Sequence, residues 1–189
     1  YAGRQASERL GLKGIGIPSH PREGVSLTAL EDALRHHPIK ACLFMLNFAN
    51  PTGSLVTDAR KKELVSLLHR YQIPLIEDDV YAELYFGKQA PLCTKAEDRD
   101  GFVMHVSSFS KCLAPGYRLG WVAAGRYAGQ IQRQKLSTSL ATTVPVQIAL
   151  ADYLKHGAFE NHLRQLRRKL AEQEAGLVAA VERHFPEGT

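Results

Sequence analysis

The stretch Ser107–Trp121, with the sequence SSFSKCLAPGYRLGW, lies between two short apolar segments of the chain. These segments, Phe102–Val106 and Leu119–Ala124, are each short enough to be a buried strand. Pro115 and Gly116 favour a turn between them, so the stretch predicts a tight loop that joins two strands. Because this loop is too short for a helical crossover, the two strands are expected to run antiparallel.

The polar residues of this loop suit two kinds of chemistry. Lys111 follows a strand end, and a lysine whose pKa is lowered there can act as a Schiff-base nucleophile. Arg118 returns to the same region beside serine hydroxyls, and a guanidinium group binds two phosphate oxygens at once. The alternative is a solvated basic loop with no chemical role.

Two further strand ends carry polar residues. Ala41–Leu46 is a continuous apolar run that predicts a central buried strand, and the turn that follows it contains Asn50. Leu75 and Ile76 begin another short strand, which runs into the acidic residues Glu77–Asp79. Adjacent carboxylates cost electrostatic energy unless a positive group lies nearby or water solvates them. A plain Asn-Pro turn and a solvated acidic loop remain the alternatives at these two places.

Several helices are predicted by local signals. Thr57 is expected to cap a helix over Asp58–Tyr71, and Thr28–Glu31 has the spacing of a capping box. Apolar residues recur at helical spacing from Phe159 to about His184, which predicts one long helix. Helices and strands therefore alternate along the chain.

This alternation predicts a three-layer α/β/α sandwich with a mostly parallel sheet. Leu12–Ile17 is expected to add a short strand, and Tyr85–Asp100 resembles a mobile connection. In such sheets ligands bind beyond the carboxyl ends of the strands. Asn50, Asp78 and the Ser108–Lys111 group each follow such an end, so we expect an amide, a carboxylate and an amine to meet at one edge.

The composition restricts the class of protein. The chain has 189 residues, of which 44% are hydrophobic and 23% charged, so a globular core is expected. The net charge is +5, but the basic residues are scattered except around Arg164–Lys169, so we expect no nucleic-acid surface on this segment. No apolar run approaches the roughly 20 residues of a membrane helix, no signal peptide is visible, and no metal-ligand spacing is present. The 3 cysteines have no paired spacing, which indicates reduced thiols in a cytoplasmic protein.

In combination, the segments Asn50–Gly53, Asp78–Tyr81 and Ser107–Trp121 closely resemble motifs of fold-type I, class I and II aminotransferases. These enzymes depend on pyridoxal 5′-phosphate (PLP). The resemblance implies that Lys111 carries this cofactor as a Schiff base and serves as the catalytic residue.

The resemblance also implies the contacts to the cofactor. Asp78 would pair with the pyridine nitrogen, since the family spacing Asp-x-x-Tyr selects Asp78 and Tyr81 rather than Asp79. Asn50 and Tyr81 would contact the phenolic oxygen. Three residues of the loop would bind the phosphate, namely Ser108 and Arg118, with Ser110 as a further candidate.

The resemblance implies two possible functions. The first is a cytoplasmic aminotransferase that acts on an amino acid and a 2-oxo acid, similar to 2-aminoadipate and kynurenine-type aminotransferases. The second is a transcriptional regulator, because Asn47–Phe86 looks most like the aminotransferase-like domain of GntR-type regulators of the MocR group. Such a domain would sense an amine or amino acid. A third interpretation is a plain α/β fragment with an empty site.

The resemblance spans Tyr1–Thr189 and implies the central part of the aminotransferase large domain. A first phosphate loop and an aromatic that stacks on the cofactor ring would precede Tyr1. A small domain, with an arginine for the substrate carboxylate, would follow Thr189, and residues from about 159 to 189 would form a long helix and a linker toward it. The family also implies a homodimer, and any DNA contact would come from a domain ahead of this sequence.

Overall fold

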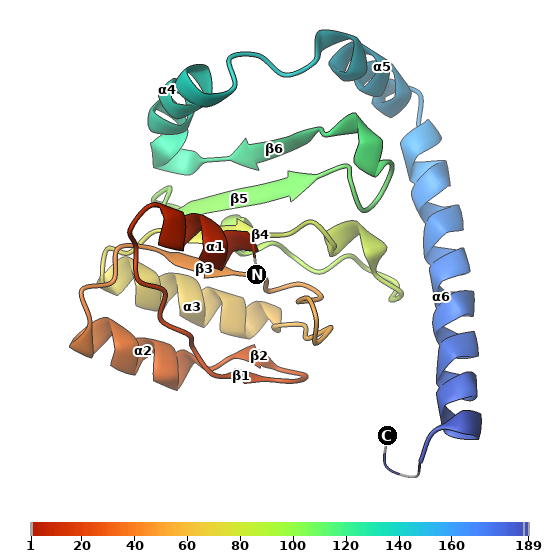
Figure 1. The fold of residues 1–189 in the computed structure, drawn as a ribbon, viewed down its shortest axis with the longest axis horizontal. Coiled ribbons are helices and arrows are strands. Elements are labelled where there is room, and N and C mark those ends of the chain that lie inside the picture. Colours follow the sequence, from red (N-terminus) through yellow and green to blue (C-terminus); the bar gives the residue numbers. More distant parts are fainter. Residues whose placement is uncertain (1, 187, 189) are drawn as a thin grey trace.

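The computed structural model describes residues 2–186 and 188, and its centre is a four-stranded sheet with the order β3-β4-β5-β6 (Figure 1). Its strands are β3 (Cys42–Phe44), β4 (Leu75–Asp78), β5 (Val103–Ser108) and β6 (Gly120–Ala123). β3, β4 and β5 pair in parallel, and β6 returns antiparallel to β5. The predicted α/β class, the mostly parallel sheet and the antiparallel return after the lysine loop are confirmed.

Helices lie on both faces of the sheet. α2 (Leu27–His36) and α3 (Asp58–Arg70) pack on one face, where Leu64 and Leu75 are both 0% exposed. α1 (Ala2–Arg9) lies against Leu43 of β3, whose side chain alternates with the buried Cys42 and so points to the opposite face. α1 therefore covers only part of the second face, and the core sits between α2, α3 and β3–β5.

The helix starts follow nearby hydroxyl groups. Thr57 caps α3 as predicted, because its Oγ1 accepts a hydrogen bond from the Arg60 N–H at 3.4 Å. The predicted capping box at Thr28–Glu31 is wrong, because α2 already begins at Leu27 and Ser26 is its cap. Ser26 Oγ accepts from the Ala29 N–H at 3.3 Å, so the hydroxyl two residues upstream of Thr28 serves the first turn.

The predicted strand over Leu12–Ile17 is also wrong. This segment has no regular structure, and Leu12 and Ile15 are exposed. The chain instead forms a short antiparallel hairpin from β1 (Ser19–His20) and β2 (Gly24–Val25). An apolar run becomes a strand only where a neighbouring strand is available for hydrogen bonding, and no described strand pairs with residues 12–17.

The second half of the chain is mainly helical. α4 (Ala128–Thr138) and α5 (Val144–Lys155) lead to α6 (Ala158–His184), which runs along one side of the molecule (Figure 1). The predicted long helix is confirmed, and the predicted linker over Phe185–Thr189 lies partly outside the described residues. Within the described part of the chain, no helix is both long and apolar enough to span a membrane. The described residues also form short 3₁₀ turns: η1 (Ala82–Leu84), η2 (Thr94–Glu97), η3 (Pro115–Tyr117) and η4 (Gly125–Tyr127).

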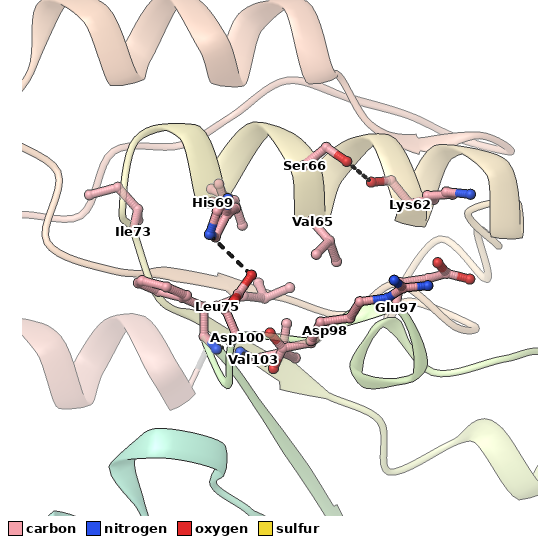
Figure 2. A pocket seen from close by; sticks show the side chains of 13 residues that line it. Lys62, Val65, Ser66, His69, Ile73, Leu75, Glu97, Asp98, Asp100 and Val103 are labelled. Atoms are coloured by element: carbon pink, nitrogen blue, oxygen red, sulfur yellow. Dashed lines mark hydrogen bonds and ion pairs between the residues drawn. The ribbon is translucent and has the colours of Figure 1, made fainter.

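A hollow of about 370 Å³ lies between α3 and the segment around η2 (Figure 2). His69 and Asp100 form an ion pair of 3.1 Å at its wall. Leu75 and Val103 also line it, and these residues begin β4 and β5. The hollow therefore lies at the opposite end of these strands from the polar residues that follow them.

Gly120 allows β6 to approach β5 closely. An alanine Cβ at this position would lie 2.8 Å from the Ser107 carbonyl oxygen and 3.2 Å from the Ser108 Cβ. Since the carbonyl belongs to the backbone, the strands must separate, and we expect Gly120→Ala to lower the free energy of unfolding by about 1–3 kcal/mol. Urea unfolding measures this change. Gly116→Ala in the same loop is the matched control, because no atom lies within 4 Å of a Cβ added there; an equal loss in both variants would contradict the prediction.

Candidate active site

Polar residues from three neighbouring strands meet at one edge of the sheet. Because β3, β4 and β5 are parallel, their carboxyl ends lie at the same edge. Asn50 lies in the turn after β3, Asp78 ends β4, and Ser108 ends β5. Lys111 follows in the loop before β6. The structure thus brings an amide, a carboxylate, a hydroxyl and an amine to one edge.

Asp78 carries an unpaired acceptor. Its Oδ1 is buried and has no hydrogen-bond partner among the described residues. Burial raises the pKa of the Asp78 carboxyl above its ordinary value, a hydrogen bond from the Val80 N–H lowers it, and the charge of Asp79 raises it. Buried polar atoms are normally paired, so this oxygen indicates a place for a donor that the described residues do not supply.

The amine of Lys111 lies over the ring of Tyr81. Lys111 is exposed, and its Nζ lies 5.8 Å from the centre of the Tyr81 ring. Within the part of the chain that the structure describes, no hydrogen bond or ion pair engages this amine. Tyr81 directly precedes η1 and is half-buried, so an amine and a phenol share one region.

The lysine loop also gathers groups that suit a phosphate. Arg118 Nη1 lies 3.4 Å from Ser110 Oγ and 3.4 Å from the Pro115 carbonyl oxygen. The Ser110 N–H donates to Ser108 Oγ at 3.3 Å. The guanidinium group is exposed, so its remaining donors are available to an anion beside two hydroxyls.

Asn50 lies near the tip of a closed turn. The Ala49 N–H donates to the Ser54 carbonyl at 3.0 Å, and the Gly53 N–H donates to the Ala49 carbonyl at 2.6 Å. The Asn50 side chain is exposed and makes no hydrogen bond to any described residue. Its amide is therefore presented to solvent at the edge of the sheet.

Helix α6 supports the lysine loop from outside. The Phe159 ring packs edge-on against Phe109 at 5.9 Å between centres, and His162 Nε2 lies 2.9 Å from the Cys112 carbonyl oxygen. The Arg167 guanidinium group stacks 4.3 Å from the centre of the Tyr85 ring. These contacts join residues distant in sequence, and no local pattern predicted them.

A buried polar network lies behind Asp78, and no motif had indicated that its members meet. Asp79 Oδ1 accepts from Asn47 Nδ2 at 2.9 Å, and its Oδ2 lies 2.8 Å from His105 Nε2. Lys61 Nζ, itself buried, donates to Asn47 Oδ1 at 2.7 Å. Burial lowers the pKa of His105, but its hydrogen bonds to Asp79 and Cys93 outweigh this effect and raise the pKa to about 10. For the acidic cluster we had expected either a positive group nearby or solvation by water, and the structure places His105 against Asp79.

The third acidic residue, Glu77, is stabilised by backbone hydrogen bonds instead of by a positive side chain. It is 0% exposed, and its two carboxylate oxygens accept from the N–H groups of Thr94 at 2.6 Å and Lys95 at 3.2 Å. These bonds hold the connection over Tyr85–Asp100, for which mobility was expected, against β4. Possible metal ligands of Glu77, Cys93 and His105 lie within 4.8 Å of one another. Both Glu77 oxygens and one His105 nitrogen are already hydrogen-bonded, so the group is a hydrogen-bonded cluster.

Solved aminotransferase structures share this fold. Kynurenine aminotransferase from Pyrococcus horikoshii superposes with a TM-score of 0.92 and 30% identity over 99% of this chain and 48% of that chain. LysN, an α-aminoadipate aminotransferase from Thermus thermophilus, gives 0.91 and 30% over 99% of this chain and 49% of its own. The LysN structure contains N-(5′-phosphopyridoxyl)-L-leucine.

Relatives by sequence carry a different name. YdcR from Escherichia coli K12, named an uncharacterized HTH-type transcriptional regulator, is 50% identical over 98% of this chain and 40% of its own length. YjiR from the same organism has the same description and is 38% identical over the same shares. The chain thus spans less than half the length of these relatives. The family model for class I and II aminotransferases matches residues 9–188. With nearly its whole length matched, this chain belongs to the class I and II aminotransferase family.

Proposed function

We propose that this chain binds PLP covalently through Lys111 and forms the central part of an aminotransferase large domain. The observation that carries the proposal is the unpaired, buried Oδ1 of Asp78 at the same edge of the sheet as the free amine of Lys111. A carboxylate in that place keeps a pyridine nitrogen protonated, and an unencumbered amine is what an aldehyde needs.

The remaining groups fit the rest of the cofactor. Arg118 and the hydroxyls of Ser108 and Ser110 suit the phosphate, because the guanidinium group and the two O–H groups can donate hydrogen bonds to its oxygens together. Asn50 and Tyr81 supply an amide and a phenol for the phenolic oxygen. These residues would hold the ring in one orientation at the strand ends.

The reaction that these residues support is transfer of an amino group from an amino acid to a 2-oxo acid. When bound, PLP supplies an electron sink that stabilises negative charge at the substrate α-carbon. Lys111 is the amine placed to remove a proton from that carbon and to return one, as general base and then general acid. Asp78 stabilises positive charge at the far side of the site, and Tyr81 lies beside the lysine amine. The protein would act in the cytoplasm as a homodimer.

A second candidate function is transcriptional regulation, and the names of the relatives favour it. YdcR and YjiR are called HTH-type regulators, and this chain covers 40% of each. In a regulator the same site would sense an amine or amino acid, and an HTH domain elsewhere in the whole protein would bind DNA. The residues that hold the cofactor would be the same in both cases.

Two measurements on the whole protein distinguish these functions. An aminotransferase converts its bound cofactor to the amine form in the presence of an amino acid and passes the amino group to a 2-oxo acid. A regulator changes its affinity for its own promoter DNA when the amine is added, without net transfer. Measuring both in one preparation decides between them.

Borohydride reduction tests the covalent attachment. We expect a phosphopyridoxyl label on Lys111 after reduction of the PLP-loaded whole protein and peptide mass mapping, because Lys111 has the free amine at the strand ends. Lys111→Arg is expected to abolish the label, whereas Lys88→Arg on an exposed loop should retain it. A label on another lysine, or no label in the wild-type protein, would overturn the proposal.

The acidic cluster gives a second test. Asp78→Asn is expected to slow conversion of the bound cofactor by an amino acid on the order of 100-fold, because charge stabilisation inside a site is lost. Asp79→Asn should cost clearly less, since Asp79 faces Asn47 and His105 rather than the site. Single-turnover absorbance measurements at full cofactor loading give both rates. Equal losses, or a larger loss for Asp79→Asn, would show that the carboxylates are wrongly assigned.

A further inference from the structure

Asp79 and His105 form a buried pair behind the candidate site. Their side chains are 3% and 12% exposed, and Asp79 Oδ2 lies 2.8 Å from His105 Nε2. His105 pairs in register with Glu77, whereas Asp78 pairs with Val106, so strand alternation puts His105 and Asp78 on opposite faces of the sheet. The pair is therefore next to Asp78 in sequence but outside the site itself.

Asp79 also fastens the end of β4 to β5. Its backbone N–H donates to the Val106 carbonyl at 2.9 Å, and its carbonyl accepts from Ser107 Oγ at 3.1 Å. With the ion pair to His105, three separate bonds join this one residue to β5. The neighbouring Asp78 is held in place by these bonds, since it is bonded directly to the residue that makes them.

The network continues into the turn that carries Asn50. Asn47 donates to Asp79 Oδ1 and accepts from Lys61 Nζ, which is 2.6 Å from the Leu92 carbonyl as well. α3, the turn after β3 and the end of β4 are thus joined through buried side chains. Two of the proposed cofactor contacts, Asn50 and Asp78, lie on elements that this network joins, so a shift of the network would displace both.

The pair also affects the net charge beside Asp78. The negative charge of Asp79 raises the pKa of Asp78, and a protonated His105 offsets that charge. Among the described residues, Glu77 and Cys93 lie near His105, and the Trp121 ring packs edge-on at 5.0 Å. Asp79 is linked to Lys61 through Asn47, and its charge also acts on Glu83. His105 is the cationic side chain in direct contact with Asp79.

We infer that Asp79 and His105 are positioning residues for Asp78: they fix the end of β4 and cancel a neighbouring charge, so that Asp78 alone presents negative charge at the site. This inference rests on the proposed PLP function. It differs from a general packing role because it requires opposite charges at positions 79 and 105, and this requirement makes it testable by paired substitution.

The test uses the PLP-loaded whole protein and the pH midpoint at which the visible absorption band of the bound cofactor changes. His105→Gln leaves the Asp79 carboxylate uncompensated, and added negative charge near the cofactor should raise this midpoint by about one pH unit. Adding Asp79→Asn removes that charge, so the double variant should return to within about 0.3 unit of the wild type. His69→Gln is the matched control, because it removes an exposed His–Asp pair at the other end of the sheet (Figure 2).

The outcomes separate this inference from the proposed function. A wild-type protein that takes up no PLP overturns both. Normal loading with the same midpoint in all variants, or a shift in the double variant at least as large as in His105→Gln, overturns the inference alone. If His105→Gln does not fold, we expect the double variant to fold and to show the wild-type midpoint; failure of the double variant to fold would overturn the cancelling of charge.

The protein without cofactor provides an independent measurement. The pKa of His105 rises from 6.5 to about 10 on folding. Its contribution to stability is therefore fully present below pH 6.5 and is lost as the pH rises through about 10. We expect the free energy of unfolding of the wild type to fall over this window, and to fall less steeply in the double variant. Parallel curves for the two proteins in urea unfolding would show that His105 gains no proton affinity on folding.

Discussion

The parallel pairing of β3, β4 and β5 is the constraint on which the candidate site depends. It places three strand ends at one edge. The extended backbone of β4 puts its successive side chains on alternate faces of the sheet. The three consecutive acidic residues are therefore separated by the sheet itself. Glu77 and Asp79 face the side of α3 and η2. There, backbone N–H groups stabilise Glu77 and His105 pairs with Asp79. Asp78 is left with a buried oxygen that has no partner among the described residues.

This arrangement explains how a fold can bury adjacent carboxylates. A buried ionised group is costly unless it is paired, and each of the two rear carboxylates has at least two partners. Asp78 is the exception, and it is the carboxylate that we propose for the pyridine nitrogen of the cofactor. The polar network holds the end of β4, and α6 packs against the lysine loop. The loops that carry the candidate site are therefore held by the rest of the fold.

The same geometry serves either proposed function. Holding PLP requires an amine, a carboxylate and a phosphate site in fixed relation, and both enzymes and sensors need that relation. The aminotransferase likeness in structure and the regulator names among the sequence relatives therefore do not conflict. The two proposed functions differ in the response to a bound amino acid, which is amino transfer in one and a change in DNA affinity in the other.

Local sequence determined much of this protein. The apolar runs predicted the sheet strands, Thr57 marked the start of α3, and the spacing of leucines predicted α6. The sequence also predicted that the motif residues follow strand ends, because apolar runs and the turns after them can be recognised from neighbouring residues. Two local signals misled. Ser26 rather than Thr28 caps α2, and no described strand pairs with Leu12–Ile17.

Only the tertiary structure decided which distant groups meet. His105 and Asp79 are 26 residues apart, Thr94 and Glu77 are 17 apart, and His162 and Cys112 are 50 apart. The acidic cluster was compatible with a nearby cation or with solvation by water, and nothing in its neighbours identified His105. A hydrogen bond between distant residues depends on how the strands and helices pack, and neither propensity nor periodicity encodes that packing.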